Sequence, residues 1–352
     1  MELPDILGRS YLDPFVIAEI GVNHEGSLER AKSLISSAAR AGAHAAKFQT
    51  YRAATLASAG NSPAYWDVSK EPTRSQYELF RKYDGFGEED YAALADHCRS
   101  LGIMFMSTPF DLDAVDMLAP LVPAFKIASA DLTNIPLLRK VARAGKPVVL
   151  SVGASSEEEI DHALRTLEQA GATRIGLLHC VLNYPTSPER ANLSAISWLT
   201  ERFGARALVG YSDHVPPAVD GEMPALEMAA ILGARVLEKH FTDDRNASGN
   251  DHYHAADEHA LRRFTKRIAE YRVMSGPGFP VLEHQSSAMR NARRRIFVTR
   301  DLMAGSQLSE SDLIALRANV GVEISRWDEV VGRVILRAIS AGDPITDDDL
   351  DD

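Results

Sequence analysis

The stretch FVIAEIGVNHEGSLERAKSLISSAARAGAHAAKFQT, residues 15–50, carries the pattern that decides the fold. It opens with an apolar run of strand length at 15–20 and closes with a second such run at 45–50. Between these runs the apolar residues recur at the spacing of an amphipathic helix, and Gly42 follows the last apolar turn, as at a helix C-terminus. The stretch is therefore predicted to form a strand, a helix and a second strand.

The same unit recurs along the chain. Six further strand-like runs follow, and they are IMFMST (103–108), AFKIAS (124–129), PVVLSV (147–152), IGLLHC (175–180), ALVGYS (207–212) and RVLEKH (235–240). Helical patterns such as EEDYAALADHCRSLG lie between them. Strands that alternate with helices pair in parallel, and eight such units favour an α/β fold of the (β/α)8 TIM-barrel type. An open doubly wound sheet is the alternative, although no G-x-G-x-x-G follows the first run.

The alternation breaks at GPGFPVLEHQSSAMRNA, residues 276–292. We predict a barrel domain over 1–280, a linker over 281–292 and a small β-rich domain over 293–352. The last part repeats one theme, in which a strand-like piece leads through Ala-Gly and an apolar step to an acidic-Asp-Leu end. A module of this size buries little core, so we expect it to pack on something else.

Composition narrows the function classes. The chain has 352 residues and a net charge of −11, which disfavours nucleic acid and anionic membranes as partners. Two cysteines and a start without an apolar signal region indicate a reducing compartment, so we expect a cytoplasmic protein. No uncharged apolar run approaches the roughly 18 residues that span a membrane.

Polar side chains stand at or near the carboxyl ends of all eight predicted strands, where the active site of a barrel forms. Burying such groups costs stability unless they are paired, so their number favours a functional site. These residues are Glu19, Lys47, Gln49, Ser107, Thr108, Lys126, Ser129, Ser151, His179, Ser212, Asp213, His214, Glu238, Lys239 and His240.

Two kinds of chemistry follow from these strand ends. Two lysines with nearby hydroxyl groups suit a phosphate or a carboxylate, through charge-assisted hydrogen bonds. His214 and His240 end neighbouring strands and could share one divalent ion, with open positions left for water and substrate. The segment GNDHYH (249–254) supplies His252 and His254 as alternative ligands, in a loop that we expect to cover the barrel mouth.

At these residues the sequence resembles the N-acetylneuraminate (sialic acid) synthase family over essentially its whole length. The matching stretches are AEIGVNHEG (18–26), KFQTY (47–51), STPF (107–110), FKIAS (125–129), YPT (184–186), GYSDH (210–214) and EKHF (238–241). The C-terminal region resembles the antifreeze-protein-like (SAF) domain that closes this family, through DLMAGSQLSESDL (301–313), Arg317 and GDPITDDDL (342–350).

The resemblance implies a synthase that condenses phosphoenolpyruvate with an N-acetylated amino sugar aldehyde, such as N-acetylmannosamine, to give a nonulosonic acid and phosphate. It implies a barrel followed by the SAF domain, in a domain-swapped homodimer whose small domain covers the partner's barrel mouth. A divalent metal, Mn²⁺ first with Mg²⁺ or Co²⁺ also possible, would bind to His214 and His240.

The resemblance also assigns residues to the substrates. The catalytic residues would be Glu19, Lys47 and Glu238, with Glu19 orienting water or acting as acid and base. The residues holding phosphoenolpyruvate would be Lys47, Lys126, Ser129, Ser151 and Ser212. The residues facing the sugar would be Gln49, Tyr184, Asp251 and, from the other chain, Arg317. Thr108 and Asn183 complete the predicted substrate contacts.

Three departures from the family pattern leave the acceptor sugar open. Leu182 stands where the family commonly has Asn, the loop at 248–252 reads SGNDH, and Ala318 and Asn319 follow Arg317. A legionaminic- or pseudaminic-type sugar or a spore-coat glycan precursor could thus be the acceptor instead. Three further functions are compatible with the sequence, namely a synthase acting on a sugar phosphate, an aldolase using free pyruvate and a non-catalytic glycan-binding protein.

Overall fold

The computed structural model describes residues 5–66, 68–69, 71–249 and 251–351, and it contains all eight predicted strands. The strands are β1 (Phe15–Gly21), β2 (Ala45–Thr50), β3 (Met104–Pro109), β4 (Phe125–Ile127), β5 (Val148–Ser151), β6 (Ile175–Cys180), β7 (Leu208–Asp213) and β8 (Val236–His240). The helices after them are α1 (Leu28–Arg40), α2 (Ala53–Leu56), α3 (Gln76–Arg81), α4 (Glu88–Leu101), α5 (Leu112–Leu118), α6 (Ile135–Arg143), α7 (Glu157–Gln169), α8 (Ala195–Phe203), α9 (Pro224–Ile231) and α10 (Glu258–Ser275).

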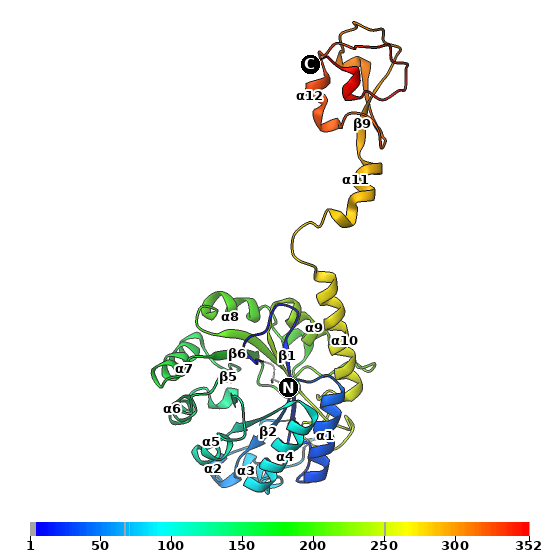
Figure 1. Cartoon of the computed structure of the whole chain (residues 1–352). Coiled ribbons are helices and arrows are strands. Elements are labelled where there is room, and N and C mark those ends of the chain that lie inside the picture. Colours follow the sequence, from blue (N-terminus) through cyan, green and yellow to red (C-terminus); the bar gives the residue numbers. More distant parts are fainter. Residues whose placement is uncertain (1–4, 67, 70, 250, 352) are drawn as a thin grey trace. The chain divides into compact units, whose positions relative to one another are not determined.

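The eight strands form one parallel sheet in the order β3-β2-β1-β8-β7-β6-β5-β4, which curls into a nearly closed barrel with the helices outside it (Figure 1). Neighbouring strands are hydrogen-bonded in a register that brings their polar ends level. Glu19 pairs with Lys47 on one side and with His240 on the other, and Ser212 pairs with Glu238. The predicted (β/α)8 TIM barrel is confirmed, and the doubly wound alternative is wrong.

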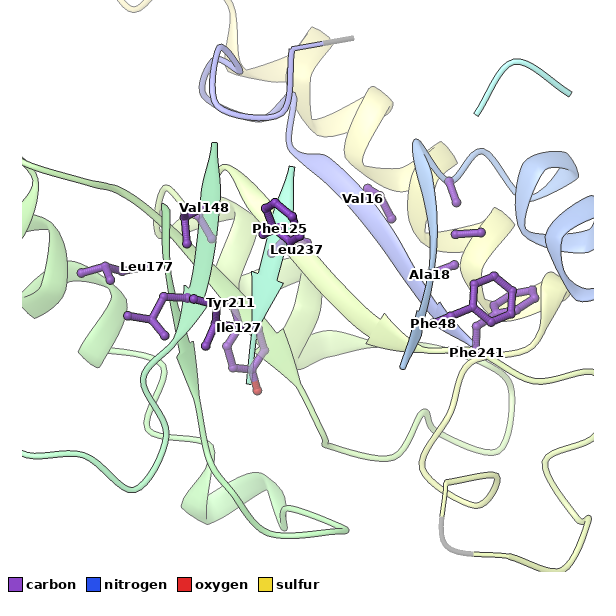
Figure 2. Close-up of a cluster of buried hydrophobic side chains, with 14 of the residues drawn as sticks. Val16, Ala18, Phe48, Phe125, Ile127, Val148, Leu177, Tyr211, Leu237 and Phe241 are labelled. Atoms are coloured by element: carbon purple, nitrogen blue, oxygen red, sulfur yellow. The ribbon is translucent and has the colours of Figure 1, made fainter. Parts of the chain in front are cut away.

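Side chains alternate along each strand between the barrel interior and the helix layer. Phe15 and Ile17 belong to a small interior cluster, and Glu19 follows two residues later on the same face. Val16 and Ala18 instead join the large core between strands and helices, part of which Figure 2 shows. The interior thus changes from apolar to polar toward the carboxyl ends of the strands, which places the site there.

The chain divides into two compact units, Met1–Ser275 and Gly276–Asp352. The second unit contains α11 (Ser286–Ala292), which falls in the predicted linker and has no buried residue, and the antiparallel strands β9 (Arg294–Val298) and β10 (Leu313–Arg317), with α12 (Trp327–Val330). It also has an apolar core of its own, and that core includes Ile296, Val298, Leu302, Leu308, Val330, Ile335 and Ile345. The small β-rich domain predicted at the C-terminus is therefore confirmed.

Short 3₁₀ helices complete the secondary structure, at Ser129–Asp131, Pro188–Arg190, Glu283–Gln285, Glu310–Asp312, Ile324–Arg326 and Asp347–Asp349. In the part of the chain that the structure describes, no helix has the length and apolar character that crossing a bilayer requires.

Candidate functional site

The carboxyl ends of the strands surround a cavity of about 310 Å³. Most of the predicted site residues line it, and these are Glu19, Lys47, Gln49, Thr108, Lys126, Ser129, Ser151, Tyr184, Ser212, His214, Glu238, His240 and Asp251. They come from every strand of the barrel except β6, whose own contribution to the wall is Cys180. The barrel geometry has therefore brought together residues that lie far apart in the sequence.

A buried ionic network occupies the floor of this cavity. The Lys47 ammonium lies 2.5 Å from a Glu19 carboxylate oxygen and 3.6 Å from one of Glu238, and it donates a hydrogen bond to Thr108 Oγ1 at 3.1 Å. Lys126 lies 3.7 Å from the other Glu238 oxygen, which also accepts a hydrogen bond from Ser212 at 3.1 Å. Two lysines and two carboxyl groups thus form one buried network.

The pKa values of the two carboxyl groups in this network are shifted in opposite directions. Burial raises the pKa of Glu19; Lys47 opposes the rise and Glu238 adds to it, so that the net direction is upward. Burial also acts to raise the pKa of Glu238, but the nearby Lys126 and Lys47 outweigh it and hold that pKa below its usual value. Glu238 is therefore the permanent carboxylate, and Glu19 is the one suited to exchange a proton.

Hydroxyl groups line the cavity on the β4–β5 side. The Ser129 hydroxyl accepts a hydrogen bond of 2.9 Å from the backbone N–H of Gly153. Ser151 Oγ is buried and has no hydrogen-bond partner among the described residues. Burial lowers the pKa of Lys126, so an anionic ligand placed beside it would favour its charged form. This side of the cavity suits an anion.

Gly21, at the end of β1, leaves room where three site residues meet. Its φ is +55°, and a Cβ there would lie 3.2–3.4 Å from Gln49, Glu19 and Asp251. Gln49 donates a hydrogen bond of 3.0 Å to Glu19, and burial raises the pKa of Asp251 to about 7. A side chain at Gly21 would therefore strain the backbone and crowd Gln49, Glu19 and Asp251.

Imidazoles gather on the β7–β8 side. The ring centroids of His214 and His240 are 5.5 Å apart, and burial lowers the pKa of both, to about 4 for His214, so that both are neutral at pH 7. Ligand atoms of His240, Asp251 and His254 all lie within 4.8 Å of one another, so these residues could also hold a cation. Neutral imidazoles beside a carboxylate fit a divalent transition metal.

The structure separates the two histidines of the GNDHYH loop, which the sequence offered as alternative ligands. His254 lies in the imidazole cluster and is fully buried. His252 instead lies 2.7 Å from Thr242 Oγ1 and 3.3 Å from a Glu25 oxygen. Only a chain trace could have distinguished them, because residues two apart in this irregular loop need not share a face.

One predicted residue of the barrel lies outside the main cavity. Asn183 is exposed and lines a second cavity beside Trp198, whereas Leu182 faces the main cavity as well. Successive side chains of an extended segment point to opposite sides, so a shift of one residue moves the amide out of the site. Arg317 is exposed at the end of β10 in the second unit, and its contact with the sugar in a partner's barrel stays a prediction.

The sequence patterns did not reveal an aromatic wall of the cavity. The connection between β2 and β3 supplies Tyr65, Trp66, Phe80 and Tyr83 to the cavity, and Tyr51 lies at its start. The β2–β3 connection is much longer than a barrel needs and is rich in aromatic residues, which could have indicated a role at the site. No periodic pattern, however, assigns such a loop to the barrel mouth. Flat apolar rings can pack against the C–H groups of a sugar.

A second ion pair supports the site from behind. Asp213 and Lys239 point away from the cavity, between residues that line it, and their charged atoms lie 2.9 Å apart. Both side chains are almost fully buried. Asp213 also accepts hydrogen bonds from Tyr211 and from the backbone of Val215. The pair therefore ties β7 to β8 directly beneath His214 and His240.

The fold and the site together define a (β/α)8 barrel with a buried, charged cavity at its strand ends, which is the arrangement of barrel enzymes. The model of the NeuB family matches residues 34–279, and that of the SAF domain matches residues 293–351. The chain therefore belongs to the NeuB family.

Similar proteins support this assignment. N,N'-diacetyllegionaminic acid synthase of Legionella pneumophila is 36% identical over 93% of this chain and 92% of its own length. Among solved structures, the spore coat polysaccharide biosynthesis protein SpsE of Bacillus subtilis is 32% identical, with a TM-score of 0.64 and 98% of both chains covered. The N-acetylneuraminic acid synthetase of Leptospira borgpetersenii, solved with citrate, is 32% identical, with a TM-score of 0.68 over 79% of this chain and 91% of its own.

Proposed function

We propose that this protein condenses phosphoenolpyruvate with an N-acetylated amino sugar aldehyde to give a nonulosonic acid and phosphate. The observation that carries the proposal is the single cavity in which Glu19, Lys47, Lys126 and Glu238 lie beside buried imidazoles. The names of the relatives support it, because acids of the legionaminic and sialic type are their products.

Phosphoenolpyruvate is assigned to the side of the cavity between β2 and β7. Lys47 and Lys126 supply positive charge, and the hydroxyls of Ser129, Ser151 and Ser212 supply hydrogen bonds to phosphate or carboxylate oxygens. The free Ser151 hydroxyl supports this assignment, because no described residue satisfies it. Thr108 positions the Lys47 ammonium.

A divalent metal is assigned to His214 and His240, with Mn²⁺ as the first expectation and Mg²⁺ or Co²⁺ as the next. The fit rests on buried imidazoles that are neutral at pH 7 and therefore have lone pairs to give. When bound, such an ion would polarise the aldehyde oxygen of the open-chain sugar.

The proposed reaction forms one carbon–carbon bond and consumes one water molecule. C3 of phosphoenolpyruvate attacks the aldehyde carbon, and the aldehyde oxygen gains a proton and becomes a hydroxyl group. Water adds to C2, and phosphate leaves with the second water proton as its C–O bond breaks, so that C2 becomes the keto carbon. Glu19 would take the proton of the water, because its raised pKa brings it closer to neutral pH, and Gln49 would hold its carboxylate in place. Glu238 keeps the two lysines charged and positioned.

Leu182 favours an acceptor sugar other than N-acetylmannosamine. It faces the cavity at the position where sialic acid synthases commonly have an amide, while Asn183 faces away. An apolar side chain there loses one hydrogen bond to a hydroxyl and gains contact with a methyl group. A diacetamido sugar of the legionaminic type, which the relative from Legionella pneumophila names in its product, is the acceptor that this change suits.

The assembly and the compartment complete the proposal. We assign to the chain a cytoplasmic location and a domain-swapped homodimer, in which Arg317 reaches the sugar in the partner's barrel. The alternating exposed residues Ile314 and Leu316 of β10 support a docking surface, because they leave an apolar strip uncovered on that unit.

The test is to incubate the purified chain with phosphoenolpyruvate, Mn²⁺ and a panel of amino sugars, and to read phosphate release together with product mass. We expect stoichiometric phosphate and a nonulosonic acid, with a diacetamido sugar used better than N-acetylmannosamine. Product formation from free pyruvate, without phosphate, would instead identify an aldolase. Sugar binding without turnover of any acceptor would favour a glycan-binding protein.

A further inference from the structure

A third imidazole lies beside the two assigned metal ligands. The ring centroid of His254 is 4.7 Å from that of His240 and 6.0 Å from that of His214. Two imidazoles on one ion, with metal–nitrogen bonds of about 2.1 Å, have ring centroids within roughly 6.5 Å of each other. The three rings therefore cluster, and ligand atoms of His254, His240 and Asp251 lie within 4.8 Å of one another.

The hydrogen-bonding capacity of the buried His254 side chain is not satisfied. Its side chain is fully buried, yet neither ring nitrogen has a hydrogen-bond partner among the described residues. His252, two residues earlier in the same loop, has both Thr242 and Glu25 beside its ring nitrogens. A histidine that only packed would be expected to find such partners, since unpaired buried polar groups are rare. The lone pair of His254 is therefore available to a ligand.

The surroundings of the other two rings leave nitrogen atoms available for the same ion. His214 Nδ1 lies 2.8 Å from the Val181 carbonyl oxygen, which can only accept, so this nitrogen carries the proton and Nε2 has the free lone pair. His240 Nδ1 lies 3.5 Å from an Asp251 oxygen and has no hydrogen-bond partner among the described residues. Tyr184 packs against all three rings, at centroid distances between 4.2 and 6.0 Å.

We propose that His254 is a third nitrogen ligand of the divalent ion, beside His214 and His240, so that this chain holds the ion through three imidazoles. The inference rests on the metal proposed above. It also concerns metal choice, because imidazole suits ions such as Co²⁺ and Zn²⁺ better than it suits Mg²⁺. The chain should therefore retain Co²⁺ more tightly than a site with two imidazoles would.

The test measures Co²⁺ binding to the full chain by calorimetry, without substrates. His254→Ala should bind Co²⁺ at least about 10²-fold more weakly, beyond the 10–100-fold typical of losing a partner that only orients a ligand. His254→Gln keeps the size of the side chain and guards against misfolding of the alanine variant. His252→Ala is the matched control, because it removes a buried imidazole from the same loop, and its affinity should stay within a few-fold of wild type.

A second measurement counts the ligands directly. In the Co²⁺ form, each bound imidazole that keeps one ring N–H gives a paramagnetically shifted, exchangeable proton resonance. We expect three such resonances in the wild type and two in His254→Gln.

Unchanged affinity and resonance number in both His254 variants would overturn the third ligand, as would an equal loss in His252→Ala. Failure of the wild type to bind Co²⁺ would overturn the metal site itself, whereas inactivity with intact Co²⁺ binding would bear on the proposed reaction alone.

Discussion

At the scale of single residues, the site depends on two carboxyl groups that face the same lysine but behave differently. Glu19 is close to Lys47 alone, while Glu238 lies between Lys47 and Lys126. One cation does not offset the burial of Glu19, whose pKa Glu238 also raises, whereas two cations offset the burial of Glu238. A small difference in position thus shifts the pKa values of two neighbouring carboxyl groups in opposite directions.

We expect Glu19→Gln to lower kcat by about 10² or more, because it removes the group that we propose as the acceptor of the water proton. The variant should still bind phosphoenolpyruvate, since Lys47 and Lys126 remain. Because the folded pKa of Glu19 is raised, the acidic limb of the wild-type rate profile should lie above pH 4.5, the ordinary value of a glutamate, and it should vanish in the variant. Rate profiles and phosphoenolpyruvate titrations check both points, and near-normal kcat would make Glu19 a structural residue.

At the scale of elements, the period of a strand explains both what the sequence could predict and what it could not. The eight runs have a period of two that carries on into the polar ends, so both the position and the direction of Lys47 and Glu238 could be predicted. His179 shows the limit, because it points outward to the carbonyl of Ala191, and Cys180 faces the cavity instead.

Loops have no such period. Asn183 and His254 both lie in loops after strands, and the direction of each depends on backbone turns that no local pattern encodes. The aromatic wall of the β2–β3 connection was missed for the same reason. Residues of the strands could therefore be assigned to the site from the sequence, whereas residues of the loops required the fold.

We expect Lys239→Met to destabilise the barrel by about 3–5 kcal/mol, because it leaves the Asp213 carboxylate buried and uncompensated between β7 and β8. Lys140→Met is the matched control, since the ion pair of Lys140 with Asp116 is exposed and should be worth less than about 1 kcal/mol. Urea unfolding followed by the signal of the barrel measures both. Equal losses in the two variants would show that the buried pair adds nothing beyond a surface contact.

At the scale of the whole molecule, the chain consists of two units with separate cores. The second unit buries its own residues, including Ile296 and Val330, although we expected a module of this size to need support from outside. Its exposed residues therefore need not serve its stability. This leaves Arg317 and the apolar strip of β10 available for contact with a barrel, whether of the same chain or of another.

Complementation between two inactive variants distinguishes these arrangements. In a domain-swapped dimer, each site combines Glu19 of one chain with Arg317 of the other, because Arg is suited to a directional contact with a sugar oxygen. A dimer of one Glu19→Gln chain and one Arg317→Ala chain then has one site with both native residues. After subunit exchange of equal amounts, half of the dimers are mixed and half of their sites are intact, so activity should recover to about a quarter of wild type. Exchange is verified with differently tagged chains. Without swapping, every site in the mixed dimer lacks one of the two residues, and the mixture stays inactive. Inactivity after verified exchange would therefore mean that Arg317 serves its own barrel or no site at all.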